Sequence, residues 1–303
     1  MPSGARSIGM LGATGFLGRK LVDRLSARSD VALRLFGRRE SEVAGHRVRP
    51  WPAAASDLEG LDVLVHLSGI TSSRASDAAL AAANVHLPME TARAAASVGV
   101  PRFVFVSSLH AHAKASETAI RPTSPFRPVD SYGRSKRDAE LALREVAAAR
   151  PMQLAILRPP MIYGPGGTGS FAQLAALIRR GLPIPLGLAN QPRSFCSVEN
   201  AASAVEHLVF TNGAEDVLLP ADPEDLTPRG LALAIGRELG RDIHPLPVPK
   251  SLLAAPLALV GRSAIVTSLF EPLCIDRGHW ETVRWRPVQT GAEGMRQALS
   301  SSP

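Results

Sequence analysis

A tyrosine and a lysine four residues apart, Tyr132 and Lys136, are the side chains in this sequence best suited to proton transfer. On a helix, residues with this spacing share a face, so the phenol and the ammonium can point into one site. A nearby ammonium favours the phenolate, so Tyr132 could exchange a proton well below its ordinary pKa of about 10. Ser107 and Ser108 stand upstream, and a serine hydroxyl beside the phenol can hold a carbonyl or alcohol oxygen. Together these residues indicate redox chemistry at a carbonyl or an alcohol.

A glycine-rich segment, Gly12–Gly18, follows the first apolar run and opens a helical pattern. Gly12 permits a tight turn, Gly15 lets a pyrophosphate approach the helix N-terminus, and Gly18 allows close packing of helix on strand. The spacing is G-x-x-G-x-x-G rather than G-x-G-x-x-G, but its place between a strand and an amphipathic helix favours a dinucleotide site. The alternative interpretation is a glycine-rich turn with a purely structural role.

The residues at the end of the second predicted strand are expected to determine whether NAD or NADP binds. An acidic residue there binds the 2′-hydroxyl of NAD, whereas arginine favours the 2′-phosphate of NADP. The sequence has Arg38 and Arg39, followed by Glu40. We therefore expect NADP to be favoured over NAD. The alternative is that both arginines are simply solvated and Glu40 is displaced from the ribose.

Short apolar runs alternate with helical patterns through the first 150 residues or so. This alternation implies a parallel sheet covered by helices on both faces, a doubly wound α/β fold. We expect residues 1–160 to form this nucleotide-binding domain. The predicted strands are 7–11, 31–36, 62–67, 102–106 and 153–157, and the predicted helices are 16–27, 78–98 and 131–149, the last capped by Asp130 or Ser131.

The composition of the sequence changes after Pro159. Proline and glycine become frequent, and the helical patterns are separated from one another. We expect residues 161–303 to form a smaller, mostly helical lobe that binds substrate, with at least one strand returning to the main sheet. The predicted helices are 171–180, 198–210, 228–239, 250–260 and 291–299, and the predicted strand is 217–219.

Composition excludes several classes of function. The chain is 45% hydrophobic and 20% charged, which is ordinary for a globular protein. Its net charge of +7 comes from scattered arginines with only 5% aromatic residues, so no nucleic-acid partner is expected. Cys196 and Cys274 lack metal-ligand spacing, so we expect free thiols and no metal site. No apolar run reaches the roughly 20 residues of a membrane span, so we expect a cytoplasmic protein with no membrane partner.

Further motifs occur in a fixed order along nearly the whole chain. They are Val65–Gly69, Asn84-Val85, Phe103–Ser108, Leu157–Pro165, Arg193–Val198 and Trp285-x-Pro287, together with the glycine segment and the Tyr132–Lys136 pair. As an ordered set they resemble the extended short-chain dehydrogenases/reductases. The closest subgroup is the NAD-dependent epimerase/dehydratase family of UDP-glucose 4-epimerase-like enzymes, which act on nucleotide sugars. The resemblance implies a Rossmann fold for the first domain and a homodimer formed through two long helices.

The resemblance also implies roles for individual residues. Ser108 would be the catalytic serine, with Ser107 as runner-up on the nicotinamide side. Tyr132 would be the acid/base, and Lys136 would bind the nicotinamide ribose and lower the pKa of Tyr132. Asn84 would lie near the cofactor, or else cap a helix start. The expected cofactor-binding set is Gly12, Thr14, Gly15, Phe16, Leu17, Gly18, Arg38, Arg39, Leu67, Ser68, Gly69, Asn84, Ser107, Tyr132, Lys136, Pro159 and Ile162.

Substrate contacts follow from the same resemblance. Arg193 matches an arginine that meets the diphosphate of a sugar nucleotide, where a guanidinium fork suits two oxygens. The alternative for Arg193 is an ion pair with Glu199 or another acid. Thr71 to Arg74 and His110 to His112 follow strand ends and would line the sugar pocket.

Three departures from the family pattern bear on specificity. The acidic ribose ligand is missing, and residues 47–57 lack the Gly-Asp-Leu that would contact adenine. Met161 stands where the best-studied epimerases carry a substrate-binding asparagine. The exact substrate therefore does not transfer from those enzymes.

The resemblance implies hydride transfer at a sugar carbon of a nucleotide-diphosphate sugar. Tyr132 would take the hydroxyl proton while Ser108 orders the oxygen. An epimerase returns the hydride to the other face of the sugar. The alternative is an NADPH-dependent ketoreductase of a 4-keto nucleotide sugar or of another small ketone. Such an enzyme uses the same residues but only delivers a hydride to the ketone, with Tyr132 as the acid.

Two other hypotheses are weaker. A dehydratase needs an acid beside the serine, and Leu109 and His110 follow Ser108 instead. A non-catalytic NADP-binding sensor or scaffold would be expected to lose Tyr132 or Lys136, and both are present.

Overall fold

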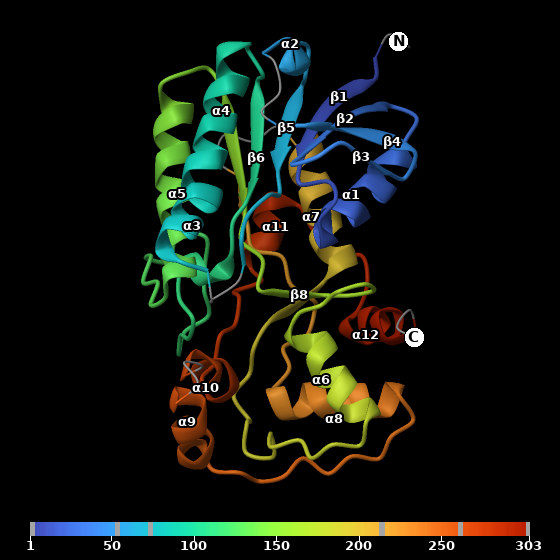
Figure 1. The fold of residues 1–303 in the computed structure, drawn as a ribbon, viewed down its shortest axis with the longest axis vertical. Coiled ribbons are helices and arrows are strands. Elements are labelled where there is room, and N and C mark those ends of the chain that lie inside the picture. Colours follow the sequence, from blue (N-terminus) through green and yellow to red (C-terminus); the bar gives the residue numbers. More distant parts are fainter. Residues whose placement is uncertain (1–3, 52–54, 72–74, 212–215, 260–262, 301–303) are drawn as a thin grey trace.

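A twisted, mostly parallel sheet forms the upper half of the molecule (Figure 1). The computed structural model describes residues 4–51, 55–71, 75–211, 216–259 and 263–300. Among these, eight strands pair in the order β10-β7-β6-β5-β1-β2-β4-β3, and only β3 runs antiparallel to its neighbour. The strands are β1 (Arg6–Leu11), β2 (Val31–Gly37), β3 (Ser41–Val43), β4 (His46–Pro50), β5 (Val63–His66), β6 (Arg102–Val106), β7 (Gln153–Leu157) and β10 (Asp216–Leu218).

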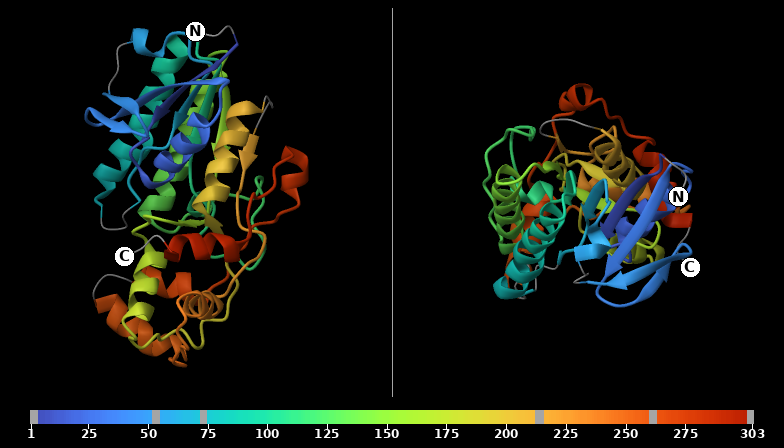
Figure 2. Two further views of the ribbon diagram at one scale, coloured as in Figure 1. Left: turned by 90° about the vertical axis from the view of Figure 1, so that its right-hand side faces the viewer. Right: turned by 90° about the horizontal axis from the view of Figure 1, so that it is seen from above.

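Helices cover both faces of this sheet (Figures 1 and 2), which confirms the predicted doubly wound fold. One face carries α3 (Asp77–Ala81), the π-helical turn η1 (Ala82–His86), α4 (Leu87–Ser97) and α5 (Ser131–Ala148). The other carries α1 (Phe16–Ser26) and α7 (Val198–Phe210). The predicted helix 78–98 is thus three helical segments in succession, and Asp130 is the N-cap of α5.

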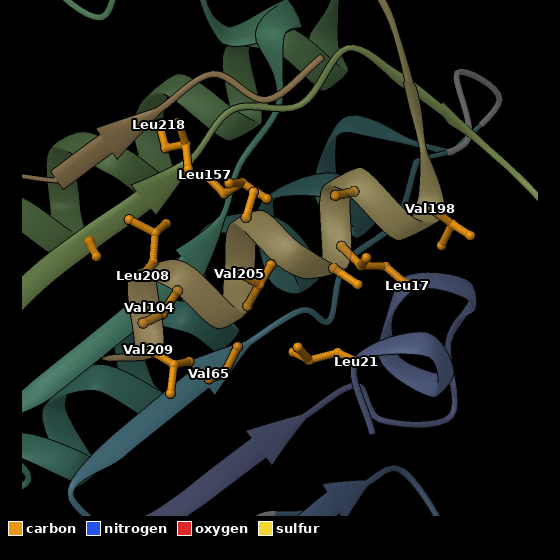
Figure 3. Close-up of a cluster of buried hydrophobic side chains, with 14 of the residues drawn as sticks. Leu17, Leu21, Val65, Val104, Leu157, Val198, Val205, Leu208, Val209 and Leu218 are labelled. Carbon is orange, nitrogen blue, oxygen red and sulfur yellow. The ribbon is translucent and has the colours of Figure 1, made fainter. Parts of the chain in front are cut away.

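Helix α7 lies beside α1 on this face of the sheet, and Figure 3 shows Leu17 and Leu21 of α1 next to its side chains. Its alanine and valine side chains are buried, whereas its glutamates Glu199 and Glu206 form ion pairs with cations of α1. Strand β10 follows it and pairs with β7, so the prediction that a later strand returns to the main sheet is confirmed. The division of the chain at residue 160 stays a prediction.

Most of the remaining C-terminal elements lie below the sheet in Figure 1, whereas α11 (His279–Val283) contacts β10. Their core is an apolar cluster shared by α6 (Ser170–Arg179), α8 (Pro228–Glu238) and α12 (Gly291–Ser300). Helices α9 (Lys250–Leu259) and α10 (Ser263–Phe270) pack on each other. The other elements are α2 (Ala55–Leu58), the 3-10 turn η2 (Leu109–Ala111), α11 (His279–Val283) and a parallel pair, β8 (Met161–Tyr163) with β9 (Phe195–Ser197).

The sequence patterns located every long element but missed several short ones. β3 and β4 carry only Val43 and Val48 as buried side chains, so they show too little apolar alternation to be recognised. The strands β8 and β9, and the helices α2, α10 and α11, were also not predicted. In the described ranges, no helix combines the length and the apolarity that crossing a bilayer would require.

Candidate active site

Ser108 and Tyr132 meet below the carboxyl ends of β6 and β7. Two hydrogen bonds extend the pairing of these strands, from Ser107 N to Leu157 O (2.8 Å) and from Leu109 N to Pro159 O (2.9 Å). They hold Ser108 in extended backbone at the start of η2, where its hydroxyl accepts from His110 N at 3.2 Å. The same hydroxyl hydrogen-bonds the Tyr132 phenol. The serine and the tyrosine are therefore brought together, as predicted.

Helix α5 approaches η2 closely because residue 133 is glycine. A Cβ at Gly133 would collide with the carbonyl of His110. The close approach puts the Tyr132 ring 6.0 Å from the His110 ring, edge to face. A substitution at Gly133 would thus move the phenol itself.

The pKa of Tyr132 is raised, not lowered as the sequence analysis predicted. Burial of the phenol is the largest cause, the Ser108 hydrogen bond opposes it, and the carboxylate of Asp130 adds to it. The Lys136 ammonium instead donates to Val106 O at 2.9 Å and lies 4.9 Å from the centre of the Phe105 ring. The prediction was wrong because it counted the ammonium and left out the desolvation of the phenol.

Lys136 is almost fully buried, with 4% of its surface exposed. Burial lowers its pKa to about 8, and the nearby Glu140 carboxylate opposes this. Its ammonium also lies under Gly69, where an added Cβ would be 3.4 Å from Nζ and 2.8 Å from Asn84 Oδ1. A glycine at residue 69 therefore places no side chain against the Lys136 ammonium.

Asn84 holds that loop in place. Its Oδ1 accepts from Ile70 N (2.8 Å), and its Nδ2 donates to Ile70 O (2.9 Å) and to Ser135 Oγ (3.0 Å). Asn84 is fully buried within the π-helical turn η1, and Ser76 caps the helix start instead. The interpretation of Asn84 as a helix-start cap is therefore wrong, and its side chain positions residues 69–70.

The glycine segment forms a cradle between β1 and α1. Gly12 has a φ of +96°, and a Cβ there would lie 2.8 Å from Ser68 N. A Cβ on Gly18 would collide with the carbonyl of Gly12. Gly15 is the N-cap of α1 and leaves its first turn without a side-chain cap, so the free N–H groups there could bind an anion. These residues fit a dinucleotide pyrophosphate.

Four other residues of the expected cofactor set use their side chains in packing. Leu17 belongs to the core cluster (Figure 3), and Leu67 and Ile162 pack against it. Phe16 lies against the turn at Gly164 and Gly167. Leu17 is buried, whereas Phe16, Leu67 and Ile162 are only partly buried.

A cavity of about 400 Å³ opens beyond the glycine segment and is lined by Thr14, Arg38, Arg39 and Ser41. Glu40 turns away and pairs with Arg47 at 2.6 Å. Arg38 and Arg39 are exposed, and neither forms an ion pair with an acidic side chain in the described part of the chain. The cavity therefore presents two cations and no carboxylate.

Arg193, predicted to bind substrate, is 7% exposed. Its Nη1 donates to Glu271 O (2.6 Å) and its Nη2 to Lys114 O (3.2 Å), and burial lowers its pKa to about 10. The predicted alternative, an ion pair with Glu199, is wrong because Glu199 pairs with Lys20 and Arg24 across α1 and α7.

His110 is the one of the two predicted histidines that lies at this site. Burial lowers its pKa to about 4, opposed by Asp130 and assisted by the cations of Lys114 and Arg193. It is therefore a neutral ring beside Tyr132 at neutral pH. His112 does not line a pocket: it is fully buried, accepts from Arg158 Nη1 at 2.6 Å and stacks on Phe126.

Among the described residues, the others predicted to bind substrate form none of the active-site contacts given above. Thr71 is exposed in the loop after β5, and Ser72 to Arg74 fall outside the described residues. Met161 is half-buried and packs against the cluster of the C-terminal lobe. Sequence reasoning missed Gly133 and Glu140, although Glu140 repeats the four-residue spacing of Tyr132 and Lys136 and could have been found from it.

Comparison with known proteins gives a consistent result. The model of the NAD dependent epimerase/dehydratase family matches residues 8–217. The UDP-glucose 4-epimerase of Vibrio cholerae is 30% identical over 312 residues, covering 98% of this chain and 95% of that protein. The ceramide reductase of Caulobacter vibrioides is 33% identical over 222 residues, covering 67% of this chain and 61% of that protein. The solved structure of MoeE5 in complex with UDP-glucose and NAD superimposes with a TM-score of 0.80 at 19% identity, covering 97% of this chain and 98% of that one.

Proposed function

Since this chain belongs to the NAD-dependent epimerase/dehydratase family and is an enzyme of that type, we propose that it transfers a hydride at a sugar carbon of a nucleotide-diphosphate sugar. The observation that supports this most directly is the meeting of Ser108 with Tyr132, one helical turn from the buried Lys136. A similar enzyme from Vibrio cholerae acts as a UDP-glucose 4-epimerase, and MoeE5 binds UDP-glucose and NAD. We extend a nucleotide-sugar substrate to this chain on that basis.

The nicotinamide cofactor supplies the hydride acceptor or donor when bound. Gly12, Gly15 and Gly18 would hold its pyrophosphate, because a side chain at Gly12 or Gly18 would fill the cradle. Lys136 would hold the ribose next to Gly69. Asn84 would keep residues 69–70 in position by the three hydrogen bonds of its amide.

The residues around the phenol would control the proton. Ser108 orders the substrate oxygen and Tyr132 gives or takes its proton. Because burial raises the pKa of Tyr132, the phenol is protonated at neutral pH and is ready to act as an acid. The neutral His110 ring stands beside it without adding charge. Arg193 keeps N–H donors beyond the two that are bonded, and these would bind the diphosphate.

A second candidate function is an NADPH-dependent ketoreductase acting on a 4-keto nucleotide sugar or another small ketone. Two observations favour it: the protonated resting state of Tyr132 suits ketone reduction, and the cavity at Arg38 and Arg39 suits a 2′-phosphate. We propose NADP over NAD for the same reason, since Glu40 is paired with Arg47 and does not face the ribose.

The experiment begins with mass spectrometry of the small molecules that co-purify with the protein, followed by a panel of UDP-sugars with and without added NADPH. Interconversion of two UDP-sugars without net cofactor consumption supports the epimerase. Stoichiometric NADPH oxidation with a keto substrate supports the reductase. Turnover must fall by orders of magnitude in Tyr132→Phe and persist in Glu145→Gln, a change at an exposed position of the same helix. Tight NADPH binding with no turnover on any substrate would refute both the epimerase and the reductase proposals. It would support the hypothesis of a non-catalytic NADP-binding sensor.

A further inference from the structure

A fully buried carboxylate, Glu140, shares one face of α5 with Tyr132 and Lys136. A carboxylate that is excluded from water is costly unless charged and hydrogen-bonding partners compensate it. The hydride chemistry proposed for Tyr132 and Lys136 does not itself require a third ionisable group on this face. Glu140 therefore needs a separate explanation.

Arg158 is the counter-ion of Glu140. Its Nε lies 3.0 and 3.1 Å from the two carboxylate oxygens, and its Nη2 donates to Oε2 at 2.5 Å. The side chains are 2% and 0% exposed. Ser107 completes the set by donating its hydroxyl to Oε1 of Glu140. Forked contacts of this kind fix the orientation of a carboxylate as well as its charge.

The same guanidinium also holds the segment that joins Ser108 to Tyr132. Its Nη1 donates to His112 Nε2 at 2.6 Å and to Pro122 O at 2.8 Å. Its centre lies 5.1 Å from the Phe126 ring, on which His112 stacks. A single buried pair thus contacts the residue before the catalytic serine and the chain that leads to the tyrosine.

Lys136 has few other partners for its charge. Its ammonium meets the carbonyl of Val106, the ring of Phe105 and the backbone at Gly69. His66 faces it from β5, and burial lowers the pKa of that imidazole to about 3, so His66 is neutral. On α5 itself, Tyr132 is neutral and Glu140 is the charge that opposes the effect of burial on the lysine.

We propose that Glu140, oriented by Arg158, is a positioning residue that keeps Lys136 protonated and holds the Ser107–Ser108 segment against Tyr132. The inference rests on the proposed function, because a charged Lys136 matters for hydride transfer. Without the carboxylate, the ammonium in this desolvated position keeps only a carbonyl and a ring as partners. It then loses its proton at lower pH.

The protonation of Lys136 can be measured without any substrate. The chain has only four lysines, Lys20, Lys114, Lys136 and Lys250, so NMR of protein labelled with ¹³C-lysine gives resonances that Lys→Arg variants assign. In Glu140→Gln the titration midpoint of Lys136 is expected to fall by at least about 1 pH unit, the smallest shift that a neighbouring opposite charge ordinarily produces. Glu145→Gln, on the exposed side of the same helix, should leave the midpoint in place. An unchanged midpoint in Glu140→Gln overturns the proposal.

Two further variants separate this effect from a failure to fold. Glu140→Gln leaves Arg158 buried without a counter-ion, so the double variant Glu140→Gln/Arg158→Met removes both charges. The same fall of the Lys136 midpoint is expected in the double variant, and its absence there counts against the proposal equally. Glu140→Asp restores a carboxylate and should return the midpoint toward that of the unmodified protein.

An activity profile gives a second readout once a substrate is known. In Glu140→Gln, the alkaline limb of the profile of kcat/KM against pH should shift to lower pH, by the same amount as the NMR midpoint of Lys136. A purely structural role would lower activity at every pH and leave the limb where it was, which contradicts the proposal. Absence of turnover on nucleotide sugars would refute the proposed function alone, since the NMR titration does not depend on it.

Discussion

Removing the two arginines at the end of β2 should change the choice between NADP and NAD. In the double variant Arg38→Ala/Arg39→Ala, the cavity beside Thr14 and Ser41 loses both of its cations. A hydrogen bond to a charged group contributes about 1.5–3 kcal/mol, and exposure to solvent reduces this. We take about 1 kcal/mol for each exposed arginine, or about 2 kcal/mol together, which corresponds to a roughly 30-fold weaker Kd for NADPH.

The assay is a titration of both reduced cofactors by nicotinamide fluorescence or calorimetry at fixed ionic strength. NADH lacks the 2′-phosphate, so its Kd should change by less than about threefold, within the context dependence of such contacts. Arg286→Ala is the matched control, because Arg286 is an exposed arginine paired with Glu281 far from this cavity. If NADPH and NADH weaken equally, or if the unmodified protein binds NADH more tightly, the assignment of these arginines to a 2′-phosphate is refuted.

Three other predictions concern the phenol, the glycine cradle and the buried histidines. Tyr132→Phe should lower kcat by about 10²–10⁴-fold, the usual contribution of a positioned acid/base, while NADPH binding stays within error; equal rates would remove the phenol from the mechanism. Gly18→Ala should abolish cofactor binding and destabilise the fold by about 1–3 kcal/mol, because its Cβ collides with the glycine-loop backbone, whereas Gly169→Ala, with open space around it, should behave as the unmodified protein in thermal unfolding and cofactor titration. The pKa of His66 is lowered to about 3 and that of His112 to about 4, so between those values and about 6.5 the unfolded chain binds more protons. Stability should therefore rise as pH increases through this window and be lost as pH falls; a Tm that is flat from pH 4 to 6.5, measured by differential scanning fluorimetry, would contradict the neutral buried imidazoles.

The long elements and the glycine segment were predictable because their signals are local. Apolar runs of four to six residues, separated by helical spacing, mark a parallel sheet, and β1, β2, β5, β6 and β7 all fall within a residue or two of their predicted bounds. Strands β3 and β4 escaped because an exposed edge hairpin buries too few side chains to show a pattern. The shared helix face of Tyr132 and Lys136 also follows from spacing alone.

The partners of each functional side chain were decided by packing between distant parts of the chain. Nothing in the local sequence separates Ser107 from Ser108, yet one hydroxyl bonds the buried Glu140 and the other bonds Tyr132. Arg193 binds two carbonyls rather than Glu199, because α1 supplies the cations that Glu199 contacts.

What the sequence alone determined is the order of the elements, the place of the glycine segment between β1 and α1, and the side chains available for proton transfer, since these depend on residue type and on short spacings. The tertiary structure alone decided the direction of the Tyr132 pKa, the neutrality of His110 and the charge balance at Lys136. Those properties depend on how much water is excluded and which distant groups come near. Both are set by the packing of α5 against α4, η1, η2 and β7, which no local spacing encodes.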